Sequence, residues 1–195
     1  MTTPLIALCV GHSRELAGRR DGGAVSVGGI SEWEYNAALA PLIAGHLERY
    51  GIRSVIVEHY QGHGYTAAMR WLAEHLRDLD VAAALELHFN AAGPTARGHE
   101  WLHWHSSRRA RALAVGLDYE MRLQVPPAML PARGPKPRTP SDRGAEFLRL
   151  THCPAVIAEP FFGSNVEDWK IATRHQSKIA LAIANGIDAW IEGEG

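Results

Sequence analysis

Histidine and glutamate side chains stand near the ends of apolar segments at several points along the chain. The candidates for chemistry are His12, Glu32, His88 and Glu159. Imidazole nitrogens and carboxylate oxygens are the donors that a catalytic zinc ion takes, usually three of them with one position left open. A further carboxylate nearby can take a proton from the water that the metal activates. The four residues therefore predict metal-assisted hydrolysis, although their long spacings match no compact zinc motif.

Apolar runs of strand length alternate with segments of helical periodicity, and this alternation sets where the four candidates lie. The expected strands are residues 5–10, 54–59, 81–89, 98–104 and 155–162, and the expected helices are residues 31–50, 65–79, 106–123 and 173–191. Such alternation is typical of an α/β fold with a central, mostly parallel sheet. Ligands of these sheets bind beyond the carboxyl ends of the strands. Three of the four candidates fall there, and Glu32 opens the first helix.

The connections carry their own signals. Residues 11–29 hold six of the 19 glycines, and residues 126–140 hold six of the 11 prolines. We expect both segments to be loops, the second one rigid or extended. Ser31, followed three residues later by Glu34, has the pattern of a capping box at a helix start.

Composition limits the class of protein. The 195 residues fit one domain, residues 1–195, and a net charge of −1 argues against a nucleic-acid binder. No stretch approaches the roughly 20 apolar residues of a membrane span. The N-terminal segment lacks the features of a signal peptide. We therefore expect cytoplasmic synthesis without an export signal or stable membrane insertion. Cys9 and Cys153 are too few for a disulfide framework, and we expect Cys9 to be buried.

Short motifs in a fixed order resemble a known family over about residues 5–190. They are Gly11-His12, then Gly29-Ile30-Ser31-Glu32 with Asn36, then Leu87-His88-Phe89-Asn90-Ala91, then Arg133-Gly134 with Lys136, then Leu148-Arg149, and finally Pro154-Ala155-Val156-Ile157-Ala158-Glu159-Pro160-Phe161-Phe162-Gly163-Ser164-Asn165. The set is similar to the catalytic domain of zinc-dependent N-acetylmuramoyl-L-alanine amidases of the amidase-3 type, found in cell-separation enzymes and phage endolysins. One departure is Ser13-Arg14-Glu15, where the family commonly has Gly-Gly-x-Asp.

The resemblance implies a fold, a cofactor and a reaction. The fold would be a three-layer αβα sandwich around the mostly parallel sheet. His12, Glu32 and His88 would bind one Zn²⁺ per chain, and Glu159 would be the catalytic carboxylate. Glu34 could compete with Glu32 as a ligand, but the spacing from Glu32 to Asn36 fits the family pattern. The reaction would be hydrolysis of the amide between N-acetylmuramic acid and L-alanine in peptidoglycan.

Four further residues are candidates for substrate binding, each beside a structural alternative. Arg133 and Lys136 match family positions and would meet peptide-stem carboxylates or the developing oxyanion, or else belong to a solvated basic loop. Asn90 and Asn165 would hydrogen-bond substrate or cap turns. His103 and His105, two residues apart, could bind metal but fit better as a pair on a sheet surface.

The leading interpretation is a monomeric, compact phage or prophage endolysin that reaches the cell wall after release by another protein. Two alternatives remain. The first is a zinc hydrolase of the carboxypeptidase or N-acyl-amino-acid amidohydrolase kind, acting on small soluble substrates. The second is a non-catalytic peptidoglycan-binding module. The presence of Glu159 argues against the second alternative, because a binding module has no need of a catalytic carboxylate.

Overall fold

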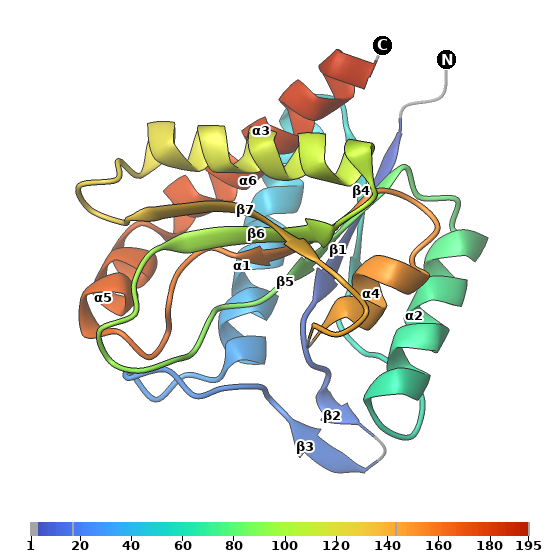
Figure 1. Cartoon of the computed structure of the whole chain (residues 1–195), viewed down its shortest axis with the longest axis horizontal. Helices are drawn as coiled ribbons and strands as arrows, with labels where there is room; N and C mark the ends of the chain where they lie inside the picture. Colours follow the sequence, from blue (N-terminus) through green and yellow to red (C-terminus); the bar gives the residue numbers. More distant parts are fainter. Residues whose placement is uncertain (1–3, 17, 143, 195) are drawn as a thin grey trace.

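A mixed six-stranded sheet forms the centre of the molecule in the computed structural model, which describes residues 4–16, 18–142 and 144–194 (Figure 1). Its strands are β1 (Leu5–Val10), β4 (Arg53–Val57), β5 (Ala83–Leu87), β6 (His99–Trp104), β7 (Ala132–Arg138) and β8 (Ala155–Glu159). Their order is β4-β1-β5-β8-β6-β7, and neighbours are parallel except for the antiparallel pair β6–β8. The predictions for the N-terminus and the basic segment include Met1–Thr3 and Arg143. These residues lie outside the described part of the chain.

Helices cover both faces of this sheet, which makes the predicted three-layer αβα sandwich. They are α1 (Glu32–Arg49), α2 (Tyr65–Asp78), α3 (Arg108–Gln124), α4 (Ala145–Leu150), α5 (Val166–Arg174) and α6 (Gln176–Glu194). One apolar core joins the sheet to α1, α3 and α6, and a second core joins its other face to α2 and α4. Among the described helices, none combines the length and the apolar character needed to cross a bilayer.

The start of α1 follows directly from its sequence. The Ser31 hydroxyl accepts from the Glu34 backbone N–H at 3.3 Å, and the Glu34 carboxylate accepts from the Ser31 N–H at 2.9 Å. This reciprocal capping box confirms the predicted start. Glu32 is therefore held in the first turn of a well-anchored helix.

The two segments predicted as loops both contain strands. Residues 11–29 include a small antiparallel hairpin of β2 (Arg14–Leu16) and β3 (Arg19–Asp21). The proline-rich segment contains β7, which forms one edge of the sheet. Proline lacks an N–H, so it weakens a central strand but is tolerated at an edge. Pro135 and Pro137 are two residues apart, so their missing donors fall on the same side of β7, away from β6.

Short elements and element ends also differ from the prediction. The helices α4 and α5 were not expected, and the predicted helix 173–191 begins instead at Gln176, after α5 ends. The strands β5 and β8 stop two or three residues earlier than predicted. Beyond their ends an isolated bridge between Asn90 and Phe162 continues the pairing. Both cysteines are free, and Cys9 is buried as expected.

Candidate active site

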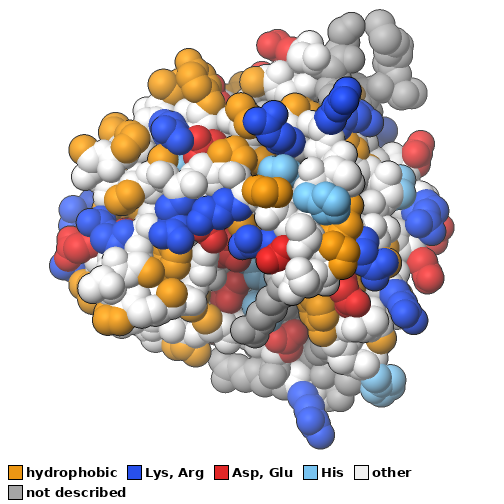
Figure 2. Space-filling view, in the orientation of Figure 1, with side chains coloured by type: hydrophobic (Ala, Val, Ile, Leu, Met, Phe, Trp, Pro, Cys, Tyr) orange, Lys and Arg blue, Asp and Glu red, His pale blue; other side chains and the backbone are white. Residues whose placement is uncertain are grey.

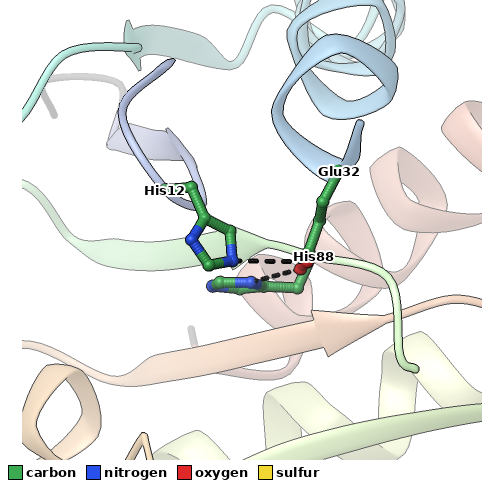
Figure 3. A group of neighbouring side chains, drawn as sticks. All are labelled: His12, Glu32 and His88. Atoms are coloured by element: carbon green, nitrogen blue, oxygen red, sulfur yellow. Dashed lines mark hydrogen bonds and ion pairs between the residues drawn. The ribbon is translucent and has the colours of Figure 1, made fainter. Parts of the chain in front are cut away.

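Three predicted metal ligands meet at the carboxyl edge of the sheet (Figure 3). His12 follows β1, Glu32 is the first residue of α1, and His88 follows β5. Each offers one donor atom, and these atoms all lie within 4.8 Å of one another. Glu32 stands between the two rings, with its Oε2 3.3 Å from His12 Nε2 and its Oε1 2.7 Å from His88 Nδ1. The resulting donor set has two imidazole nitrogens and one carboxylate.

Two glycines allow the backbone to come close to these three side chains. A Cβ on Gly11 would lie 2.4 Å from His88 Cε1, and a Cβ on Gly23 would lie 2.4 Å from His12 Cδ2 and 2.7 Å from Glu32 Oε2. Gly23 also has a φ of +70°, which favours glycine. The glycine-rich loop is therefore packed against the ligands rather than simply connecting two elements.

Backbone donors hold the Glu32 carboxylate in place. The Ala24 N–H donates to Oε2 at 3.1 Å, and the Phe89 N–H donates to Oε1 at 3.2 Å. Burial alone would raise the pKa of Glu32, but its contacts with His12 and His88 outweigh burial and lower that pKa strongly. Glu32 is thus an ionised carboxylate, the form that binds a cation.

A second carboxylate stands behind each histidine. Asp21, at the end of β3, lies 2.9 Å from His12 Nδ1, and Glu86, within β5, lies 3.3 Å from His88 Nε2. Metal-binding histidines commonly donate their other N–H to such a carboxylate. Neither carboxylate is among the residues predicted from the sequence. Glu86 could have been found from strand alternation, because it lies two residues before His88, whereas Asp21 depends on the unpredicted hairpin.

The neighbouring carboxylates raise the pKa values of both imidazoles. Burial disfavours the protonated form of His12, but Glu32 and Asp21 outweigh burial and raise its pKa. Burial also acts against protonation of His88, and Glu86 and Glu32 raise the pKa of His88 well above its ordinary value. Both rings therefore lie in a strongly negative environment, which attracts protons and metal cations alike.

Glu159 ends β8, the strand next to β5. The pairing of Leu87 with Ala158 places His88 and Glu159 at the same level of the sheet, and Glu100 on β6 pairs with Glu159 from the other side. Glu159 Oε2 is buried and has no hydrogen-bond partner among the described residues. Burial and the nearby carboxylates of Glu32, Glu100 and Glu86 raise the pKa of Glu159 to about 8, although His88 opposes them.

Three predicted substrate-binding residues converge on Glu100, which is not among the residues predicted from the sequence. Arg133 Nε lies 2.6 Å and Lys136 Nζ 2.9 Å from Glu100 Oε2, and the Asn90 side chain donates to Oε1 at 2.9 Å. The contacts with Lys136 and Arg133 lower the pKa of Glu100 despite its burial. Both cations remain about one-third exposed. The Arg133 guanidinium also lies over the Phe162 ring, 5.0 Å from its centroid.

The surface reflects this arrangement. Figure 2 shows acidic and histidine side chains in a hollow near the centre of one face, with lysine and arginine side chains beside it. The site thus combines buried acidic side chains with a positive rim, which is formed by Arg133 and Lys136.

Asn165 has a structural role in the geometry observed. Its side-chain oxygen accepts from the Glu167 and Asp168 N–H groups at 3.0 Å each, capping α5, and its amide donates to Pro94 O at 2.6 Å. This is the capping alternative considered above. Contact of Asn165 with substrate stays a prediction.

The other candidate ligands lie apart from the metal-ligand group. Glu34 is engaged with Ser31 in the capping box. His103 is buried with its Nδ1 3.0 Å from Trp104 O, while His105 is exposed. Within the described part of the chain, His12, Glu32 and His88 are the one group of three residues with metal-ligand spacing.

Solved structures with this fold are numerous. The catalytic domain of the CD27L endolysin, which targets Clostridia difficile, has 24% identity and a TM-score of 0.79, over 95% of this chain and 97% of that chain. The amidase AmiC2 of Nostoc punctiforme has 21% identity and a TM-score of 0.79, over 97% of each chain. The amidase Ami1 from Mycobacterium smegmatis has 18% identity and a TM-score of 0.81, also over 97% of each. These likenesses establish the fold.

Sequence comparison establishes the family. No curated protein matches the chain significantly. The amidase-3 family model, described as N-acetylmuramoyl-L-alanine amidase, matches residues 6–189. Nearly the whole sequence is covered by that match, which includes all four residues of the predicted metal and catalytic set. The chain therefore belongs to the amidase-3 family of N-acetylmuramoyl-L-alanine amidases.

Proposed function

We propose that this protein is a zinc-dependent amidase that cleaves peptidoglycan between N-acetylmuramic acid and L-alanine. The observation that carries the proposal is the meeting of His12, Glu32 and His88, with Glu159 on the adjacent strand. The family match supplies the reaction type. The site supplies the residues.

The donor set fits a zinc ion. Two imidazoles and one carboxylate are a known combination for catalytic zinc, which keeps a fourth position for water or substrate. The buried Oε2 of Glu159 has no partner among the described residues, which is costly unless a ligand or water meets it. A water or substrate at the open position would supply that partner. We propose one Zn²⁺ per chain, held by His12, Glu32 and His88.

Each residue then has a defined task. A bound zinc ion would polarise the scissile carbonyl and lower the pKa of water. Glu159 accepts a proton at Oε2 from the attacking water and returns it to the leaving amine of L-alanine. Its raised pKa suits both steps, since a carboxyl near neutrality can take and give a proton. The positive charge of a bound cation would draw this pKa back down.

The positive rim would recognise the peptide. Arg133 and Lys136 stay partly exposed while Glu100 fixes their heads, so they can receive a carboxylate of the stem peptide with little loss of side-chain freedom. Asn90 is held by the same carboxylate and would hydrogen-bond substrate beside them. Action as a compact endolysin, monomeric and reaching the wall after release, is part of this proposal.

Mass spectrometry of digested peptidoglycan tests the proposal. Purified sacculi are treated with the protein, with the protein after chelation, and with the chelated protein after zinc is restored. The expected products are stem peptides that begin at L-alanine, lost on chelation and recovered with zinc. Intact sacculi combined with cleavage of small acylated peptides would instead indicate the other hydrolase class. Peptidoglycan binding without new amines would indicate a binding module.

A further inference from the structure

A buried carboxylate behind the metal site has no part in the reaction proposed above. Glu86 lies in β5 and is 3% exposed. Strand alternation points it to the same face of the sheet as His88, and its Oε2 is 3.3 Å from His88 Nε2. Buried carboxylates are rare because removal from water disfavours a charged group, so the position of Glu86 needs a reason.

The His88 ring lies between two carboxylates. Its Nδ1 faces Glu32, a neighbouring metal ligand, at 2.7 Å, and its Nε2 faces Glu86. A neutral imidazole carries one N–H. Donation of an Nε2–H to Glu86 leaves the lone pair of Nδ1 directed at the metal position. Glu86 thereby selects the tautomer and the ring orientation that a metal ligand needs.

Glu86 is itself held by a tyrosine. The Tyr60 hydroxyl donates to Glu86 Oε1 at 3.2 Å. The backbone of Tyr60 is fixed in turn by Ser13, whose Oγ accepts from the Tyr60 N–H at 2.8 Å. Ser13 is the residue after His12. The side chains of Ser13, Tyr60 and Glu86 are all buried. A continuous buried chain of contacts therefore runs from one metal histidine to the other.

We propose that Glu86 is a positioning residue that orients His88 for the metal, and that Tyr60 fixes Glu86 in that task. The inference rests on the proposed function, because it requires a metal at His12, Glu32 and His88. Its effect should be seen in metal affinity and coordination as well as in turnover.

The test compares metal affinity with stability of the metal-free protein. Zn²⁺ and Co²⁺ dissociation constants are measured by chelator competition for wild type, Glu86→Gln and Tyr60→Phe, with the Co²⁺ absorption spectrum as a report on coordination. We expect Glu86→Gln to weaken zinc binding about 10- to 100-fold, to change the cobalt spectrum, and to leave the metal-free protein with a cooperative melting transition. Tyr60→Phe should weaken binding less. Asp118→Asn, which removes a buried carboxylate whose partners are His99 and Arg122, should leave the zinc affinity unchanged.

The outcomes separate the two proposals. A wild-type protein that binds no stoichiometric zinc overturns the proposed function itself. Tight binding by wild type with an equal zinc affinity in Glu86→Gln overturns the positioning role alone. Weaker binding accompanied by loss of the cooperative melting transition of the metal-free protein would also overturn it, because Glu86 would then be supporting the fold rather than orienting His88.

Discussion

At the scale of single residues, Glu32 and Glu159 are two glutamates of one site whose surroundings push their pKa values apart. The contacts with His12 and His88 overcome burial and keep Glu32 ionised. Glu159 Oε2 has no hydrogen-bond partner in the described part of the chain, and burial together with neighbouring carboxylates raises the pKa of Glu159 to about 8. Paired acids with separated pKa values commonly divide their work. Glu32 suits ligation, and Glu159 suits proton transfer.

This division predicts the behaviour of Glu159→Gln. The amide cannot accept the proton of water, so turnover should fall by about 10²- to 10⁴-fold. Zinc affinity should change little, because Glu159 lies outside the set of three ligands. Release of stem peptides and chelator competition measure the two quantities on the same preparation. Near wild-type turnover would remove Glu159 from the mechanism.

The residues of the site differ in how far the sequence reveals them. His12, His88 and Glu159 follow from apolar runs that end in chemistry-bearing residues, and the family motifs separate Glu32 from Glu34. Glu100 and Asp21 depend on distant chain segments. Glu100 gains its role from Arg133 and Lys136 on the adjacent strand, and pairing between strands is not encoded in local spacing.

At the scale of elements, the N-terminus of α1 joins the stability of the helix to the proposed metal site. Ser31 caps the helix, and Glu32 is the next residue. Loss of the cap should therefore loosen a ligand as well as a helix. The acidic first turn also faces the positive end of the helix dipole, which favours an ionised Glu32.

Ser31→Ala should lower the free energy of unfolding by about 1 kcal/mol and also weaken zinc binding. Ser107→Ala is the matched control. Ser107 caps α3 through the Ala110 N–H at 3.2 Å, on a helix that carries none of the three ligands. Urea unfolding should show similar losses for both variants, and chelator competition should show weaker zinc binding for Ser31→Ala alone. Equal zinc affinities in the two variants would contradict the coupling.

Long periodic elements are predictable from the sequence, and short or edge elements are not. The capping box gives the start of α1, and the continuous apolar run gives β1. In contrast, β7 carries prolines that normally indicate a loop, and only its edge position makes it a strand. The helix α4 spans six residues, too few for helical periodicity to show.

At the scale of the whole molecule, a buried histidine at the start of β6 links stability to pH. His99 is 0% exposed, and its Nδ1 accepts from Trp101 Nε1 at 3.1 Å. Burial lowers the pKa of His99 to about 4, although the nearby Asp118 opposes this shift. The neutral ring is therefore the form that the folded protein accommodates.

The sign of the resulting pH dependence follows from linkage. In the unfolded chain His99 regains a pKa of about 6.5, so the unfolded state binds the proton more readily. Stability from this residue is complete above pH 6.5 and is lost as the pH falls toward 4, by roughly 3 kcal/mol in total. His99→Asn should lack this part of the pH dependence. Urea unfolding of both proteins between pH 7 and 4 measures the difference, and parallel curves would refute the assignment.

The outer side of β7 determines how the sheet meets other molecules. An exposed strand edge normally offers a row of N–H groups on which a foreign strand can pair, which leads to aggregation. Pro135 and Pro137 remove two successive donors from that row. A second copy of the chain cannot extend the sheet there by regular pairing. The prolines of β7 thus protect the protein against assembly into fibrils through this edge.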